Sequence, residues 1–138
     1  MDEFLRGFHN LLRWFVLLGG LAALLTMLRG MFSSVPWTDS ARRTGTIFAG
    51  LLDLQVLVGL ILYFVSPLTR NAMGNMGAAM SDSNLRFFAV EHGLIMVLAA
   101  VAAHVGLAMA RRADTDRARY TRAGIGVIVA IVLIFLGI

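Results

Sequence analysis

The chain has no cysteine, no lysine and only two prolines among its 138 residues. Without cysteine it can form no disulfide, no cysteine-ligated iron–sulfur cluster, no thiol nucleophile and no covalently attached c-type haem. The sequence also contains no P-loop, no dinucleotide-binding glycine pattern, no HExxH helix and no nucleophile elbow. These absences exclude several large classes of nucleotide-dependent, metallopeptidase and hydrolase chemistry.

Charged residues are scarce as well. They make up 14% of the chain, whereas hydrophobic residues make up 59% and the mean hydropathy is +0.80. A soluble domain of this length would be less apolar, so the composition indicates an integral membrane protein. Four apolar segments are long enough to cross a bilayer, which takes about 20 residues. We predict an all-α, up-down four-helix transmembrane bundle forming a single domain, with spans at about 4–28, 41–65, 85–112 and 121–138.

The distribution of arginine predicts the orientation of this bundle. Loops on the side opposite the N-terminus contain eight arginines: Arg29, Arg42, Arg43, Arg111, Arg112, Arg117, Arg119 and Arg122. The N-terminal side contains four: Arg6, Arg13, Arg70 and Arg86. Because cytoplasmic loops carry the excess of positive charge, we expect both termini on the outer side of a bacterial cytoplasmic (inner) membrane. The first span has no A-x-A cleavage site, so we expect it to be retained. The net charge of +4 indicates contact with the lipid bilayer rather than with nucleic acid.

Two histidines lie at matching depths near the N-terminal side. His9 is in the first span, and His92 lies about seven residues, or roughly two turns, into the third span, which enters from the same side. At about 1.5 Å per residue, the two lie within roughly 5 Å of one another in depth. In an up-down bundle the first and third helices are parallel and diagonal across the core. Two inward imidazoles placed in this way can ligate one haem iron from opposite sides.

Charged residues in the same region suit a haem site. Arg6, Arg13 and Arg86 can pair with haem propionates, because the guanidinium group binds carboxylates through two hydrogen bonds. Glu91 can pair with Arg13 or hold an imidazole tautomer. Two other interpretations of the histidine pair remain open: a structural polar cluster with Glu91 and Arg13, or a site for a quinone or another ligand.

His104 belongs to a different location. It follows His92 by twelve residues, which places it about 18 Å deeper and about 120° around the helix. One haem therefore cannot use both. Asp53 of the second span lies at a similar depth, and we expect an Asp53–His104 hydrogen bond. We favour a structural pair, with a proton relay or a second cofactor or quinone site as alternatives.

The second loop contains three methionines, Met73, Met76 and Met80. They can suggest a soft-metal site or an axial ligand. Their i, i+3, i+7 spacing equally suits the apolar face of a short interfacial helix, which is the interpretation we favour.

Three stretches carry a resemblance to known proteins: FHNLLRW near the N-terminus, LDLQVLVGLILYFVSP in the second span and RFFAVEHGLIMVLAAVAAHVG in the third. With them, the chain resembles a group of small bacterial four-helix membrane proteins often labelled cytochrome b-like, over essentially its whole length. The resemblance points to His9 with Arg13 and to Glu91 with His92. The chain lacks the two pairs of histidines that mark the large respiratory cytochrome b, so that mechanism is not carried over.

Together these patterns predict a b-type membrane cytochrome that carries single electrons and exchanges them with other components, quinol among the candidates. We expect one haem b per chain, with quinone or another tetrapyrrole as alternatives, and membership of a larger respiratory or photosynthetic complex. Such a chain is an electron-transfer protein or subunit more than a stand-alone enzyme. The alternative is a non-catalytic structural subunit without its own cofactor. A small transporter or proton pathway through Asp53 and His104 is a third possibility, although no broken-helix repeat is visible.

Overall fold

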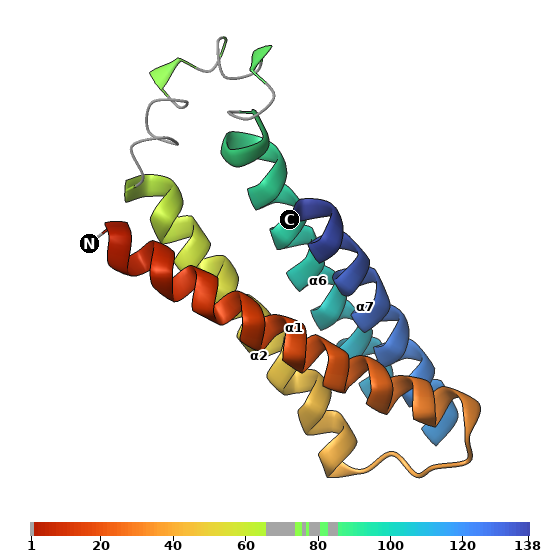
Figure 1. The fold of residues 1–138 in the computed structure, drawn as a ribbon. Helices are drawn as coiled ribbons and strands as arrows, with labels where there is room; N and C mark the ends of the chain where they lie inside the picture. The colour runs from red at the N-terminus through yellow and green to blue at the C-terminus, as the bar shows by residue number, and fades with distance from the viewer. Residues whose placement is uncertain (1, 66–73, 76, 78–80, 83–85) are drawn as a thin grey trace.

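A computed structural model describes residues 2–65, 74–75, 77, 81–82 and 86–138. Four long helices cover most of this chain (Figure 1). They are α1 (Asp2–Phe32), α2 (Asp39–Val65), α6 (His92–Arg111) and α7 (Asp116–Gly137), and a short π-helix, η1 (Phe87–Glu91), leads directly into α6. All four are long and apolar enough to cross a membrane. The chain is therefore a multi-pass membrane protein, as its composition predicts.

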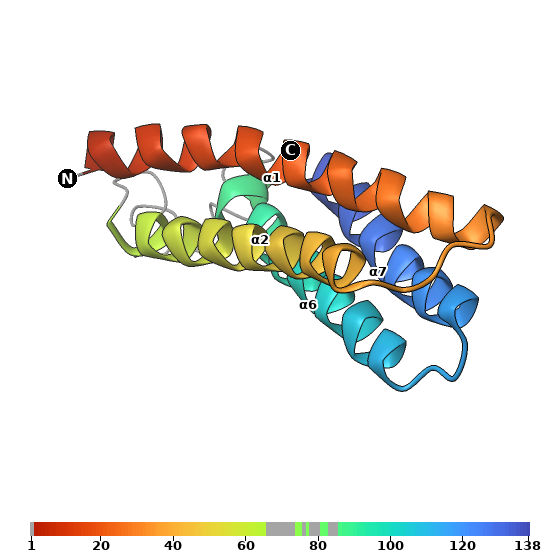
Figure 2. The ribbon, with the colours of Figure 1, turned by 90° about the horizontal axis from the view of Figure 1, so that it is seen from below.

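The helices form a ring of antiparallel neighbours. α1 contacts α2 and α7, and α6 contacts α2 and α7, so that α1 and α6 lie diagonally across the bundle. The two hairpins, α1–α2 and α6–α7, are inclined to one another, and both chain ends lie toward the end of the bundle opposite the 33–38 and 112–115 loops (Figures 1 and 2). This arrangement confirms the predicted up-down four-helix bundle and places the first and third spans as expected.

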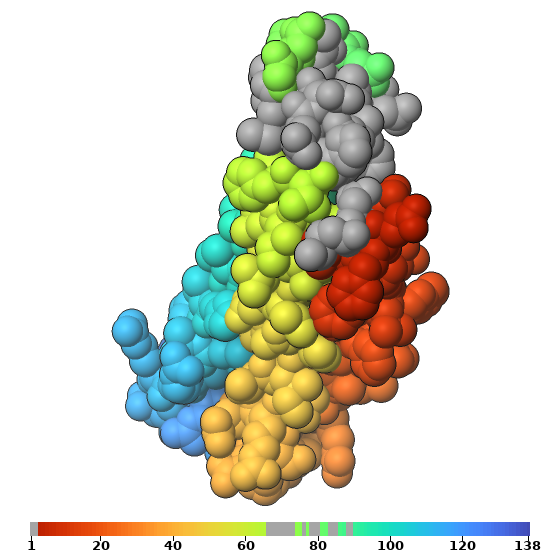
Figure 3. Space-filling view, turned by 90° about the vertical axis from the view of Figure 1, so that its left-hand side faces the viewer, coloured from red at the N-terminus to blue at the C-terminus, as the bar shows by residue number. Residues whose placement is uncertain are grey.

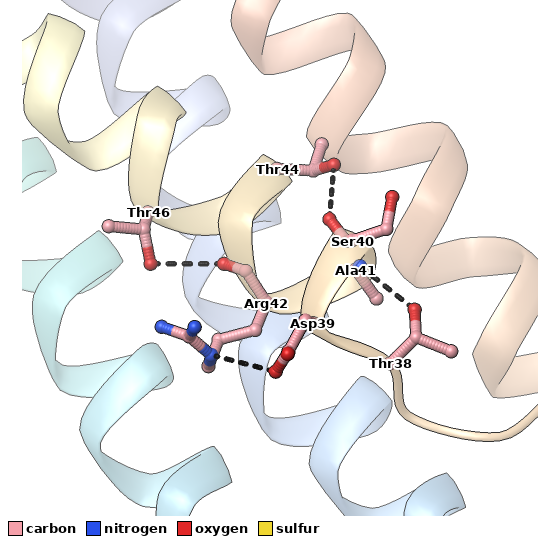
Figure 4. A network of polar contacts seen from close by, with 7 residues as sticks. All are labelled: Thr38, Asp39, Ser40, Ala41, Arg42, Thr44 and Thr46. Atoms are coloured by element: carbon pink, nitrogen blue, oxygen red, sulfur yellow. Dashed lines mark hydrogen bonds and ion pairs between the residues drawn. The ribbon is translucent and has the colours of Figure 1, made fainter.

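α2 begins at Asp39, two residues earlier than expected, because the preceding residue caps it. The Thr38 hydroxyl accepts a hydrogen bond from the backbone N–H of Ala41 at 3.1 Å (Figure 4). Asp39 lies in the first turn, where its negative charge interacts favourably with the positive end of the helix dipole. Its Oδ1 atom lies 3.8 Å from the Nε of Arg42. The loop between α1 and α2 is correspondingly short, which holds the two helices as an antiparallel pair.

α7 begins at Asp116, five residues before the expected start at Thr121. The Thr115 hydroxyl accepts from the N–H of Ala118 at 3.1 Å, and Asp116 again lies in the first turn. The charged residues that suggested a loop are therefore the first turns of the helix. A cap followed by an acidic residue satisfies the free N–H groups there, and the arginines extend from the membrane edge.

The α6–α7 pair is packed backbone to backbone. A Cβ atom placed on Gly126 would lie 2.7 Å from the Ala102 carbonyl oxygen and 2.8 Å from the Gly106 Cα atom. Buried alanines continue the contact in both directions, among them Ala99, Ala103 and Ala130. In lipid, where apolar burial does not drive helices together, small residues of this kind permit the close approach that gives dispersion contact.

Tyr120 closes the opposite end of the bundle. Its ring lies directly over Gly30 of α1, where an added Cβ would overlap the aromatic carbons. Its hydroxyl donates to the Pro36 carbonyl at 2.8 Å, and its ring meets that of Trp37 edge to face at a centroid distance of 4.9 Å. One side chain thus fixes α7, the end of α1 and the connecting loop.

Several predicted features lie outside the described residues. These are the start of the third span at Leu85, the Ser66–Pro67 end of the second span and the methionines Met73, Met76 and Met80. Within the described residues, the third span differs from the predicted continuous α-helix, because it opens with the π-turn η1.

We expect Gly126→Ala to lower the thermal unfolding temperature in detergent. The new methyl group meets backbone atoms of α6, which can yield only if the helices separate, and overpacking of this kind costs about 1–3 kcal/mol. Gly7→Ala is the matched control, since nothing lies within 4 Å of its Cβ position. The control should gain slightly, by up to about 1 kcal/mol, from helix propensity. Equal unfolding temperatures for the two variants would contradict the close contact.

Candidate functional site

The structure brings His9 and His92 together. His9 lies on α1 and His92 on α6, the two diagonal helices, and their ring centroids are 6.4 Å apart with an angle of 84° between the ring planes. The depth match predicted from the sequence is therefore present as a contact between side chains. We call these two residues the histidine pair.

A backbone carbonyl at the end of α7 orients His92. The Nδ1 atom of His92 lies 2.6 Å from the Gly137 carbonyl oxygen. A carbonyl oxygen can only accept a hydrogen bond, so Nδ1 carries the hydrogen and Nε2 is left as the nitrogen with a lone pair. The carbonyl is available because it belongs to the last residues of α7, where it has no partner within the helix. The imidazole is thereby held in the tautomer that can bind a metal through Nε2.

His9 is held against α2. A Cβ on Gly59 would lie 3.2 Å from the His9 Cε1 atom, so the ring packs on the glycine backbone. One turn away, the Gln55 amide Nε2 donates to the His9 backbone carbonyl at 2.8 Å. Gln55 is a polar residue within a membrane span, and it is buried in the bundle with only 9% of its surface exposed. Neither Gln55 nor Gly59 was predicted to belong to the site.

Two buried polar atoms in this corner lack a partner among the described residues. They are the Nδ1 of His9 and the Oε1 of Gln55. A buried polar atom without a hydrogen bond costs about 1–3 kcal/mol. The two residues are joined by the hydrogen bond from the Gln55 amide to the His9 backbone carbonyl. Among the described residues, no hydrogen bond fixes the tautomer of His9 as the Gly137 carbonyl fixes that of His92.

The π-turn before His92 determines which charged side chains lie next to each other at the start of α6. The N–H of His92 bonds to the Phe87 carbonyl, five residues earlier. Residues five apart on an α-helix lie about 140° apart around the axis, but the wider π-turn aligns them. Arg86 and Glu91 accordingly form an ion pair at 2.9 Å. Glu91 thus pairs with Arg86 rather than with Arg13, the partner considered from the sequence.

The other predicted arginines lie on α1. Arg6 is exposed one turn before His9, and Arg13 is half-buried one turn after it. The Arg13 guanidinium carbon lies 5.5 Å from the centre of the Trp14 ring, a cation–π distance. Together with Arg86 they place three guanidinium groups in the same end of the bundle as the histidine pair. Pairing of these arginines with haem propionates stays a prediction.

The geometry of the histidine pair fits one metal-centred cofactor. Two imidazoles that bind opposite sides of a metal through bonds of about 2 Å have ring centroids roughly 6 Å apart, which agrees with the 6.4 Å observed here. Beside His92, nothing lies within 4 Å of the Cβ position of Gly93, so the backbone is open to a flat group. In the described part of the chain, no three His, Asp or Glu side chains converge on a metal site. The candidate metal ligands here are therefore the two imidazoles of the histidine pair.

Asp53 and His104 form a second, separate pair. The Nε2 of His104 lies 2.7 Å and 2.9 Å from the two carboxylate oxygens of Asp53, which confirms the predicted contact. The side chains are 46% and 55% exposed and face away from the core. We call these two residues the outer pair. Its position on the lipid-facing surface was not predicted.

We expect ¹⁵N chemical shifts of histidine-labelled protein to show His92 with its hydrogen on Nδ1. The reason is that the Gly137 carbonyl can accept but not donate. Removal of residues 137–138 deletes this acceptor and should return His92 to a mixture of tautomers, while His104 keeps its hydrogen on Nε2 toward Asp53. An Nε2–H signal for His92 in the full chain would refute the orientation described above.

Comparisons of the chain with known protein families, with curated proteins and with solved structures give no match. The case for a function therefore rests on the residues of the two pairs and on the bundle that holds them.

Proposed function

We propose that the protein is a b-type membrane cytochrome that carries single electrons, with His9 and His92 as the axial ligands of one haem per chain. The observation that supports this most directly is the 6.4 Å separation of the two imidazoles on diagonal helices. Imidazole suits iron, and the interior of a helical bundle is a common location for such a cofactor. When bound, the haem supplies a one-electron couple whose potential depends on its ligands and on their hydrogen bonds.

The residues of this chain would set the ligand field. His92 presents Nε2 because Nδ1 donates to the Gly137 carbonyl, a hydrogen bond that also fixes the orientation of the ring. Gln55 holds the α1 backbone at His9 through a hydrogen bond. The His9 ring packs on Gly59, and this packing restricts the rotation of the ring. Arg6, Arg13 and Arg86 are the candidates for propionate pairing. Of these, Arg86 is already anchored by Glu91.

The distribution of arginine supports an orientation with both termini outside a bacterial inner membrane. The histidine pair would then lie near the outer face. A donor or acceptor would approach from that side or laterally from the lipid, where a quinol is a suitable candidate. The described loops 33–38 and 112–115 are short, which on that side of the bundle favours partners that are themselves membrane subunits of a respiratory or photosynthetic complex.

The test is a reduced-minus-oxidised visible spectrum with a pyridine haemochrome assay on detergent-purified, haem-replete protein. We expect about one haem b per chain, in keeping with one bis-histidine site. His9→Ala and His92→Ala should each abolish the Soret band. His104→Ala is the matched control, since this histidine lies on the outer surface, and it should retain the band. A colourless wild-type protein, or equal loss in all three variants, would overturn the proposal.

Gln55→Leu should weaken haem binding without removing a ligand. The change keeps the approximate volume of the side chain but deletes the hydrogen bond to the His9 carbonyl. Loss of a partner that orients a ligand reduces affinity by about 10–100-fold. The measurement is the rate of haem loss to apomyoglobin. Leu54→Gln, at an exposed neighbouring position of α2, is the control and should leave that rate unchanged.

The second candidate is a structural subunit without its own cofactor. It is favoured by the outward face of α7, which exposes apolar side chains and no ionisable one within the last three turns: Val129, Val132, Phe135 and Leu136. Such a face suits lipid or a neighbouring helix equally. Purification of a stoichiometric complex in which this chain binds no haem would support this function in place of the cytochrome.

A further inference from the structure

The outer pair lies near the middle of the membrane. Asp53 follows the first residue of α2, Asp39, by 14 residues and precedes the last, Val65, by 12. At about 1.5 Å per residue, Asp53 is roughly 20 Å from each end of a helix that crosses about 30 Å of hydrocarbon. Water cannot hydrate these side chains at that depth.

The pair nevertheless faces outward. Asp53 on α2 and His104 on α6 are about half exposed. These two helices lie side by side on one face of the bundle (Figure 3). The neighbouring positions on the two helices are apolar and exposed as well, Leu57 on α2 and Val101 on α6 among them. Ionisable groups at membrane depth almost always face protein or a water-filled cavity, because lipid cannot hydrogen-bond them. The surface that carries this pair therefore requires a cover other than lipid.

The pair also has hydrogen-bonding capacity left over. Both carboxylate oxygens of Asp53 contact the same atom, the Nε2 of His104. Each oxygen retains lone pairs that can accept further bonds. The Nδ1 of His104 has no hydrogen-bond partner among the described residues. When this nitrogen carries a hydrogen, the pair presents one donor and one acceptor outward.

A second copy of the chain supplies the complement. Copies inserted with the same topology are related by a two-fold axis along the membrane normal, so that each residue meets its counterpart at equal depth. Across such an axis the His104 Nδ1–H of one copy faces the Asp53 carboxylate of the other, and the two ion pairs alternate in sign. We propose that the surface of α2 and α6 around Asp53 and His104 is the interface of a homodimer.

The absence of cysteine makes the test direct. A single cysteine introduced at Leu57 is the only thiol in each chain, and it lies one turn from Asp53 on the same face. Val132→Cys is the matched control. Its side chain is 52% exposed against 54% for Leu57, and it lies on α7, diagonally opposite α2. Its depth is comparable with that of Leu57. On α6, the position level with Val132 lies between Met96, which contacts Gly137, and Gly106, which contacts Gly126.

Oxidation with copper phenanthroline in native membranes should link Leu57→Cys into a disulfide homodimer and leave Val132→Cys mainly monomeric, with at least a five-fold difference in yield. Adding Asp53→Leu and His104→Leu together to the Leu57→Cys chain should reduce its yield to that of the control. The helicity of that triple variant, followed by circular dichroism, should be unchanged, since both side chains point away from the core.

Three results would overturn the proposal. The first is an equal yield at the two positions, which indicates random collision. The second is a yield that survives replacement of the outer pair. The third is a link from Leu57→Cys to a different membrane protein with no homodimer, which assigns the surface to another subunit. None of these results depends on whether the histidine pair binds haem.

Discussion

The requirement that every polar group in hydrocarbon has a protein partner shapes this molecule more than any other constraint. The backbone meets it by forming four helices. The Nδ1 of His9 and the Oε1 of Gln55 lack a partner among the described residues. Three other polar contacts within the spans meet the requirement: His92 with the Gly137 carbonyl, the Gln55 Nε2 with the His9 carbonyl, and Asp53 with His104. Each partner comes from another helix, so these bonds also fix the rotation and the depth of the helices that they join.

The site depends in turn on contacts far from it. The glycines of α6 and α7 bring the two backbones together, with Gly106 against Gly126. That contact sets the depth at which α7 ends, and the end of α7 is the source of the carbonyl that orients His92. The Tyr120 ring over Gly30 fixes the opposite end of the same helix against α1. A change of packing in the α6–α7 hairpin would therefore reach the histidine pair through the position of a single backbone oxygen.

The sequence predicts the parts of this structure that depend on hydropathy and helical rise. It predicts four spans, the diagonal placement of the first and third, and the contacts His9–His92 and Asp53–His104. It does not predict the π-turn at Phe87–Glu91, because no periodicity distinguishes one inserted residue from an α-helix, and Arg86 was consequently not among the partners considered for Glu91. The roles of Gln55 and the Gly137 carbonyl also escape it. Both depend on how far one helix extends past another, and side-chain patterns carry no signal for a backbone acceptor.

The two pairs use the same side chain in opposite surroundings, and the surroundings decide the chemistry. In the histidine pair, each imidazole is held by a backbone contact and lies edge to face with the other imidazole. In the outer pair, the imidazole contacts both oxygens of a carboxylate, and both side chains are about half exposed. A metal would compete poorly for the second imidazole, because its Nε2 already donates to Asp53. The proposed cofactor site and the proposed dimer interface thus lie on one helix, α6, about 18 Å apart.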